Sequence, residues 1–399
     1  MGSYFVSSTP ENPEYEATAG WYIAPEEVAA PPITVWGRLR RWVRSHAAVL
    51  KYVVLPTLVL TLVGVELRTS IGQAVLLSNW AGGMSYAVEP GPSTQVRFPA
   101  HGPYNDRLGY SQLSVFTDRL VDRDYEVSAQ ARMSLPMRLT MDAGLYPVYP
   151  HKDQAGLAVR DHRGRDLFEV RYPGRAYTHP DAIPEMVWRS LLFIENRELL
   201  DRSQAYKNPA VEWDRFALAA AHRLLAGEGP GGSTLATQLT KVRHSPGGRT
   251  TSAPEKLRQM ASASLMAYRD GLSTLGARRQ IVKEYLNQLP LAATANHGEV
   301  NGLGDGLRAW YGRDVAEVTE VLTVVPADSA IAREKLERRA TAFRQVLSLL
   351  LSTRSPSRYL VREDGPADRR RPGLQLVGQR RDGRVVGERL DGGRLRLLG

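Results

Sequence analysis

A short segment in the second half of the chain combines residue types that suit a phosphate ligand. It reads GGSTLATQLTK and ends at Lys241, just before a strongly basic stretch. Gly231 and Gly232 let the backbone approach a ligand closely. Ser233 and Thr234 offer hydroxyls beside their own amide groups, and Lys241 supplies a point charge. The segment therefore predicts a binding site for a phosphate-bearing substrate.

Basic residues recur in and after this segment. Cations of this kind could neutralise a pyrophosphate, as they do at transferring phosphoryl groups. A solvated surface face is the more usual explanation of a run of charges, and that alternative stays open. The residues in question are Lys241, Arg243, Arg249, Lys256, Arg258, Arg278 and Arg279.

Glu195 is the strongest candidate for a general acid or base. It shares the three and four spacing of one helical face with the apolar residues Trp188, Leu191, Leu192 and Leu199. Apolar surroundings disfavour the charged form of a carboxyl group and make it a better proton acceptor. The alternative is a helix-end glutamate that pairs with Arg197 or Arg202.

Several other kinds of site are excluded by their spacing. The glycines do not match a nucleotide P-loop, and no G-x-G-x-x-G follows a strand. His244 and His297 have no metal-ligand partners at suitable spacing. There is no G-x-S-x-G, and no S-x-x-K with a downstream K-T-G, so neither hydrolase nor penicillin-binding transpeptidase chemistry is expected. The absence of cysteine excludes disulfides and thiolate nucleophiles.

The charge balance and one apolar segment indicate where such a site would work. Lys plus Arg exceed Asp plus Glu by 52 to 42, which favours anionic partners. Residues 47–65 carry only one charge, Lys51, and four arginines lie just upstream, so we expect a membrane anchor with a cytoplasmic N-terminus. A cleaved signal peptide is disfavoured because the leader is too long and lacks an A-x-A site. A buried core helix stays open because of Lys51 and Pro56. An extracytoplasmic domain makes nucleic acid an improbable partner.

The rest of the chain divides by pattern. Short strands and turns are expected over 67–150, followed by a hairpin over 157–178 with its turn at Asp161–Gly164. Pro184 opens a run of helices. Helices are expected through Glu195, from Asn208 to Leu224, and over 254–270, 277–289, 315–325 and 330–351. Strand-like pieces lie at 374–378 and 394–398.

With these residues in view, the segment from about 157 to 326 resembles a family 51 peptidoglycan glycosyltransferase domain, the transglycosylase module of penicillin-binding proteins and monofunctional transglycosylases. The elements of the family pattern match in order. The D-x-x-G turn corresponds to Asp161 and Gly164, the I-P helix entry to Ile183 and Pro184, and the catalytic glutamate to Glu195. The G-x-S-T segment with its lysine and arginine corresponds to Gly231, Ser233, Thr234, Gln238, Lys241 and Arg249. The K-x(6)-Y-x-N motif corresponds to Arg278, Tyr285 and Asn287, and the closing glycine pattern to Gly302, Trp310, Tyr311 and Gly312.

The resemblance implies a mainly α fold. A cytoplasmic tail (1–46) and one transmembrane helix (47–66) would precede a small β-containing extracytoplasmic region (67–180), a lysozyme-like helical glycosyltransferase domain (181–352) and an Arg/Gly-rich end (353–399). The substrate would be a lipid-linked peptidoglycan precursor (lipid II), polymerised into a glycan strand at the bacterial cytoplasmic membrane. Glu195 would be the general base, and Asn287 would hold local backbone. The residues that would bind the pyrophosphate and donor are Ser233, Thr234, Gln238, Lys241, Arg249, Lys256, Arg258 and Gln259.

The sequence departs from the family pattern at two positions where the family has carboxylates, as well as at Leu199, Ala236 and Thr237. Asn196 replaces the Asp after the catalytic Glu, and Gln259 stands where a second Glu belongs, although Glu255 is near. A neutral amide cannot hold a negative charge against a metal ion. A divalent cation, Mg²⁺ or Mn²⁺, is therefore an open question. Two alternatives stay open as well: a non-catalytic descendant that binds precursor or glycan and recruits envelope proteins, and a lytic transglycosylase.

Overall fold

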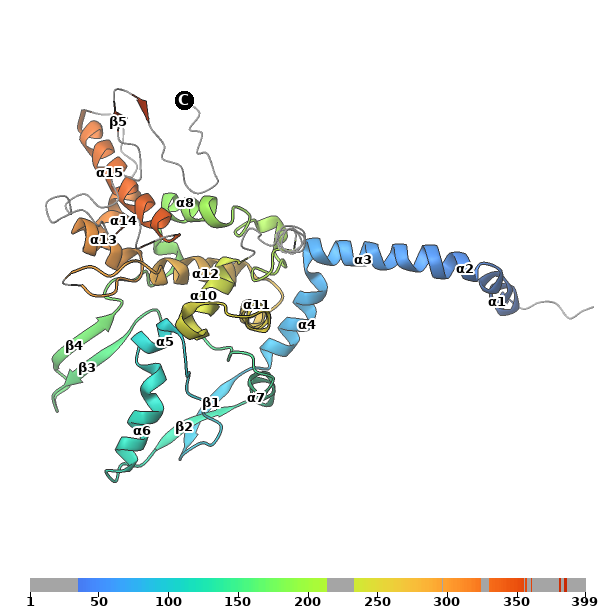
Figure 1. The fold of residues 1–399 in the computed structure, drawn as a ribbon, viewed down its shortest axis with the longest axis horizontal. Coiled ribbons are helices and arrows are strands. Elements are labelled where there is room, and N and C mark those ends of the chain that lie inside the picture. The colour runs from blue at the N-terminus through green and yellow to red at the C-terminus, as the bar shows by residue number, and fades with distance from the viewer. Residues whose placement is uncertain are drawn as a thin grey trace, which may run out of the picture. The chain divides into compact units, whose positions relative to one another are not determined.

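The structure is a computed structural model that describes residues 35–213, 233–295, 297–323 and 330–354, with residues 356, 360, 380–381 and 384–385. The chain divides into two compact units, Met1–Thr61 and Leu62–Gly399. Figure 1 labels the α-helices and the strands β1 to β5.

A continuous helical stretch follows the N-terminal tail. It consists of α1 (Val35–Ser45), α2 (Ala47–Val49), a π-helical segment η1 (Leu50–Val54) and α3 (Leu55–Thr69). The wide turn directly precedes Pro56, whose missing N–H cannot bond to the preceding turn of an α-helix. Ala47–Thr69 is long and apolar enough to cross a membrane, and none of its apolar window is buried as a core helix would be. By length and composition it is one candidate membrane span.

Residues 70–153 are more helical than the sequence predicted. They form α4 (Ile71–Gly82), α5 (Pro103–Arg107), a 3-10 turn η2 (Tyr110–Gln112), α6 (Leu113–Val121) and α7 (Leu135–Asp142). Only β1 (Tyr86–Pro90) and β2 (Ala129–Met133) pair, antiparallel. The expectation of mainly short strands and turns is therefore wrong here. Start signals were overlooked: Ser134 caps α7 and is followed by Pro136.

The predicted hairpin is confirmed. Strands β3 (Ala155–Arg160) and β4 (Asp166–Tyr172) pair antiparallel, with Gly156 opposite Arg171. The turn lies at the predicted place, where the Gly164 N–H donates to the Asp161 carbonyl at 2.9 Å. Leu167, Phe168 and Val170 on β4 remain exposed.

Most of the predicted helices are also confirmed. The structure has α8 (Glu185–Glu195), α11 (Ala253–Tyr268), α12 (Leu275–Gln288), α14 (Val315–Thr323) and α15 (Ala330–Ser352). Two further helices were not predicted, α10 (Leu235–His244) and α13 (Leu303–Tyr311). Short 3-10 turns η3 (Pro180–Ala182), η4 (Arg202–Gln204) and η5 (Pro246–Gly248) connect them.

Parts of the prediction fall outside the described residues. The body of the helix expected from Asn208 to Leu224 does so, as do the strand-like pieces at 374–378 and 394–398. The described part of the C-terminal segment includes a two-residue strand pair, β5 (Arg380–Arg381) with β6 (Arg384–Val385).

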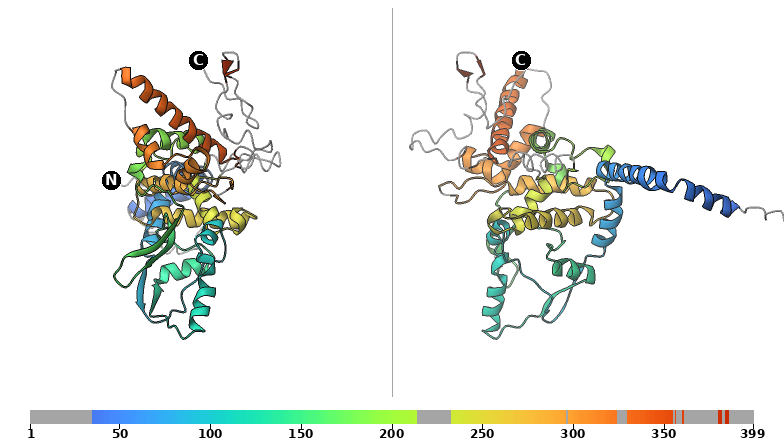
Figure 2. Two further views of the ribbon diagram at one scale, coloured as in Figure 1. Left: turned by 90° about the vertical axis from the view of Figure 1, so that its left-hand side faces the viewer. Right: turned by 45° about the vertical axis from the view of Figure 1, so that its right-hand side comes forward.

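One large core holds the helices of the C-terminal half together. Leu191 from α8, Leu239 from α10, Leu286 from α12, Leu307 from α13 and Leu349 from α15 belong to one buried cluster. Helix α10 packs on both α11 and α12, and α15 packs on α8, α13 and α14. Figure 2 shows α10, α11 and α12 close together in both views. Burial of these apolar stripes fixes the ends of α8 and α10 relative to one another.

Glycines at both ends of α13 explain two positions of the family pattern. Gly302, which precedes the helix, has φ +84°, and a side chain there would come within 2.5 Å of the Asn287 carbonyl oxygen. Gly312 ends the helix in the left-handed conformation with φ +65°. Both conformations favour glycine, and at Gly302 the missing side chain also allows the start of α13 to approach α12.

Candidate functional site

Glu195 is the last residue of α8 and is half-buried. Gln238 on α10 donates from Nε2 to Glu195 Oε2 at 3.3 Å. Tyr285 on α12 in turn donates its hydroxyl to Gln238 Oε1 at 3.3 Å. Burial, reinforced by the charge of Glu195, raises the pKa of Tyr285, so this hydroxyl stays protonated and available as a donor. Three helices thus contribute to one chain of hydrogen bonds that ends on a carboxylate.

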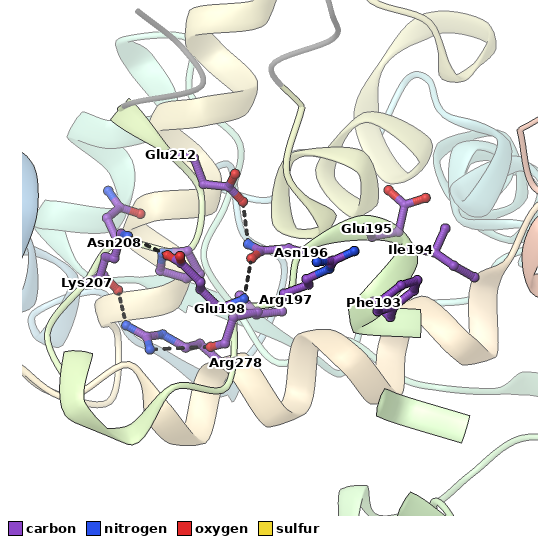
Figure 3. A pocket seen from close by; sticks show the side chains of 12 residues that line it. Phe193, Ile194, Glu195, Asn196, Arg197, Glu198, Lys207, Asn208, Glu212 and Arg278 are labelled. Atoms are coloured by element: carbon purple, nitrogen blue, oxygen red, sulfur yellow. Dashed lines mark hydrogen bonds and ion pairs between the residues drawn. The ribbon is translucent and has the colours of Figure 1, made fainter. Parts of the chain in front are cut away.

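A cavity of about 360 Å³ opens beside Glu195. Its walls include the apolar Phe193, the acidic Glu212 and the basic Lys207. Figure 3 shows the Glu195 side chain separated from the Asn196, Glu212 and Arg278 side chains that line the other part of the cavity. A polar ligand that entered here would meet groups of both charges next to the candidate base.

A cationic group lies on α10 and α11. It consists of Lys241, Lys256 and Ser233, the residue before the cap of α10. Lys256 Nζ donates to Ser233 Oγ at 2.7 Å. Burial lowers the pKa of Lys256, and the charge of Lys241 lowers it further. Burial also lowers the pKa of Lys241. Two half-buried ammonium groups that repel each other are suited to an anion, which would relieve the repulsion.

Other members of the predicted basic set already have partners. Arg243 pairs with Glu284 at 3.0 Å, and both side chains are buried. Arg278 donates to four backbone carbonyls, those of Leu199, Asp201, Gln204 and Lys207. These contacts leave neither arginine available for an anion. Arg278 instead fixes the loop that follows α8.

Arg258, Arg249 and Arg279 differ in their surroundings. Arg258 pairs with Glu255 at 3.3 Å and Arg279 pairs with Asp181. Arg249 is exposed just after η5, and its side chain makes no ion pair with a residue that the structure describes. Of these three, Arg249 is the one best able to reach a bound anion.

Residues far apart in the sequence therefore form a hydrogen-bonded chain that ends on Glu195, and α10, which contributes Gln238 to this chain, also carries Lys241 of the lysine pair. The transglycosylase family model matches residues 163–371 of the 399, about half of the chain. The chain belongs to the transglycosylase family. The match corresponds to the family 51 glycosyltransferase domain that the motifs indicated. A search of curated proteins found no match.

The matched part of this transglycosylase begins in the β3–β4 turn and includes Glu195 and both lysines. Asn287 holds the backbone of the segment that enters α8. Its Oδ1 accepts from the Tyr177 N–H at 2.8 Å, and its Nδ2 donates to the Tyr177 carbonyl at 2.9 Å. The transglycosylase thus uses α12 for support, through Arg278 and Asn287, as well as for the Tyr285 hydroxyl.

Gln259 of the transglycosylase lies behind the cationic group. Its side chain is fully buried, donates to Ser245 Oγ at 2.9 Å and accepts from Thr250 Oγ1 at 3.0 Å. It supports the turn that carries Arg249 rather than facing a ligand. Glu255 is equally committed, because Tyr146 and Ser245 donate to its Oε1.

The described residues do not fit a divalent cation held by the transglycosylase itself. Among them, no three His, Asp or Glu side chains come together as metal ligands. The positions at which the family pattern has carboxylates carry the amides of Asn196 and Gln259, and both amides are engaged within the protein. We derive no catalytic step through a metal ion.

The sequence did not point to two residues of the cavity. These residues are Glu212 and Lys207, which line the cavity together with Asn208. Glu212 follows the Asn-Pro helix-start signal by three residues, where carboxylates are favoured, so a capping role would have been the expectation. Gly231 and Gly232 lie outside the described residues. Thr234 is buried and caps α10, with its Oγ1 3.3 Å from the Thr237 N–H.

Proposed function

We propose that this transglycosylase polymerises a lipid-linked disaccharide precursor, lipid II, into glycan strands and releases polyprenyl pyrophosphate. The observation that carries the proposal is the placement of Glu195, held by Gln238, at the end of a helix whose neighbour α10 also bears Lys241. Polymerisation needs a base for the acceptor hydroxyl and cations for the leaving pyrophosphate, and both are supplied here.

The proposed reaction is an inverting transfer. Glu195 takes the proton of the acceptor sugar's 4-hydroxyl as that oxygen bonds to the anomeric carbon of the donor. The bond from this carbon to the pyrophosphate oxygen breaks, and the electron pair leaves with the pyrophosphate. Lys241, Lys256 and Arg249 would stabilise the new charge, and Ser233 and Gln238 would position the donor. A pyrophosphate is a good leaving group, so no general acid is needed, in contrast to the two-carboxylate scheme of glycosidases.

The apolar helix Ala47–Thr69 supports a membrane location for this reaction. We propose a single-pass protein of the bacterial cytoplasmic membrane whose transglycosylase domain lies on the outer side, because the arginines that precede the helix favour a cytoplasmic N-terminus. The polyprenyl chain of the substrate would then stay in the same bilayer as the anchor. Its partners would be the lipid-linked precursor, the growing glycan strand and other envelope proteins.

Substitution of the proposed base tests the mechanism. The full-length Glu195→Gln protein should form no glycan polymer from labelled lipid-linked disaccharide, because an amide cannot accept the proton. Gel separation of the products would show this. Glu185→Gln is the matched control, since Glu185 lies on the same helix and forms an exposed pair with Arg189. Unchanged polymerisation in the Glu195→Gln protein would overturn the mechanism.

The amides at Asn196 and Gln259 favour one second candidate, a non-catalytic family member that binds precursor or glycan as an envelope scaffold. Wild-type protein that bound labelled lipid-linked disaccharide without forming polymer, with or without added Mg²⁺ or Mn²⁺, would support it. Release of anhydro-sugars from isolated sacculi would instead indicate a lytic transglycosylase.

A further inference from the structure

The side chain of Asn196 is held at both ends. The chain leaves α8 here with an extended backbone, φ −161° and ψ 99°. Asn196 Oδ1 accepts the N–H of Glu198 at 3.0 Å, which fixes the orientation of the amide. Its Nδ2 therefore faces the cavity, where it donates to Glu212 Oε1. Figure 3 shows both contacts and also the side chain of Glu195, the residue before Asn196.

Only an amide satisfies this arrangement while Glu212 is a carboxylate. An asparagine offers an acceptor to Glu198 and a donor to Glu212, whereas an aspartate offers acceptors alone. With an aspartate at position 196, two half-buried carboxylates would meet, and like charges disfavour each other at that distance. The change from the family's aspartate to Asn196 therefore matches the acceptor at Glu212.

We propose that Asn196 and Glu212 form a positioning pair that fixes the carboxylate of Glu195 at the end of α8. Asn196 is the C-cap of α8 and is bonded to Glu195 through one peptide link, so the contacts that hold Asn196 anchor the helix end that carries the carboxylate met by Gln238. On this basis the amide at 196 is a matched change of partner and not the loss of a catalytic acid. The catalytic consequence rests on the proposed polymerase function, whereas the pair itself rests on the contacts.

Exchange of the two groups tests the pair in the full-length protein. Asn196→Asp should lower kcat for polymerisation at least about tenfold with little change in KM, since a charge-assisted hydrogen bond is replaced by repulsion. Glu212→Gln should stay within about threefold of wild type, because its Oε1 still accepts from Asn196. The double variant Asn196→Asp/Glu212→Gln should recover most of the lost kcat, because the glutamine amide donates to the new carboxylate.

Glu185→Gln is the matched control. Glu185 lies at the other end of α8, outside this cavity, and forms an exposed pair with Arg189. It should neither impair the wild-type background nor rescue Asn196→Asp. Full activity of Asn196→Asp, or a double variant no better than the single one, would overturn the proposal.

A measurement without turnover separates this inference from the proposed function. The thermal unfolding midpoints of wild type, Asn196→Asp, Glu212→Gln and the double variant form a double-mutant cycle. Asn196→Asp should lower the midpoint by a few degrees, and the added Glu212→Gln should restore it. Additive shifts would overturn the pair even in an active enzyme. A non-additive cycle together with a wild-type protein that makes no polymer would refute the polymerase function and leave the pair standing.

Discussion

At the scale of single residues, the candidate site combines one carboxylate with two half-buried lysines, and the charge of Lys241 lowers the pKa of Lys256. The pKa of Lys256 is lowered by burial and by Lys241, so both groups gain from a bound anion. An exposed lysine pair would be screened by water and salt and would offer a pyrophosphate much less. The half-burial of both side chains is therefore part of how the donor would be recognised.

The lysine pair leads to a prediction for the pH dependence of donor binding. Because the pKa of each lysine is lowered, affinity for labelled polyprenyl pyrophosphate disaccharide should fall with rising pH over a lower range than it would for ordinary lysines, whose pKa is 10.5. Lys241→Met should weaken binding at neutral pH by about tenfold or more, since it removes a charged contact. It should also move the alkaline loss of affinity upward, because Lys256 no longer feels a neighbouring charge.

Equilibrium binding at several pH values measures both effects. Lys335→Met provides the comparison, because Lys335 is exposed on α15, outside the cationic group and outside the cavity beside Glu195. A Lys241→Met protein whose affinity declined over the same alkaline range as wild type would contradict the coupling of the two lysines.

At the scale of helices, α10 determines most of the site, and its N-terminus is fixed by a reciprocal cap. The Thr234 N–H donates to Thr237 Oγ1 at 2.9 Å, and the Thr237 N–H donates to Thr234 Oγ1 at 3.3 Å. Thr234 Oγ1 also donates to the Ala210 carbonyl at 3.3 Å. The cap sets the first turn of the helix that carries Gln238 and Lys241.

Removal of this cap should destabilise the protein. We expect Thr234→Ala to lower the free energy of unfolding by about 1 kcal/mol, the usual effect of losing an N-cap oxygen. Thr234→Ser keeps that oxygen and should stay within about 0.5 kcal/mol of wild type. Urea unfolding followed by tryptophan fluorescence would measure both. Equal stability of the alanine and serine variants would show that the cap contributes little.

The same helix shows which parts of the fold could be predicted from sequence. Helices α8, α11, α12, α14 and α15 were predicted because apolar stripes and local start signals are written within each segment. Helix α10 was missed because its residues were interpreted only for phosphate binding and not for secondary structure. Glu195 and Lys241 could be proposed from residue type and spacing. The burial of Arg243 against Glu284, and the contact of Asn196 with Glu212, depend on helices that meet only after folding.

At the scale of the second unit as a whole, the segment before the family match is packed against the back of α10. Gly102 has φ +110°, and a side chain there would collide with the Arg243 carbonyl. Asn105 donates to the same carbonyl at 2.5 Å. Tyr146 stacks on His244, with ring centroids 4.5 Å apart, and the ring centroid of His151 lies 5.8 Å from that of His244. The C-terminal end of α10 is thus covered by residues outside the transglycosylase match.

This interface should make the protein sensitive to acid. Burial, together with the charge of Arg243, lowers the pKa of His244 from 6.5 to about 3. At pH values between these two pKa values, His244 is protonated in the unfolded chain and neutral in the folded protein. The free energy of unfolding therefore falls as the pH drops below 6.5. From about pH 7 to pH 5 the loss should be about 2 kcal/mol from His244, at about 1.4 kcal/mol for each pH unit.

His244→Phe keeps an aromatic ring against Tyr146 and removes the titration. Its unfolding free energy should therefore fall less over this range than that of wild type, whereas His297→Phe, at an exposed histidine, should follow wild type. Urea titrations at each pH would decide the matter, and parallel pH profiles for wild type and His244→Phe would show that this interface does not carry the acid sensitivity.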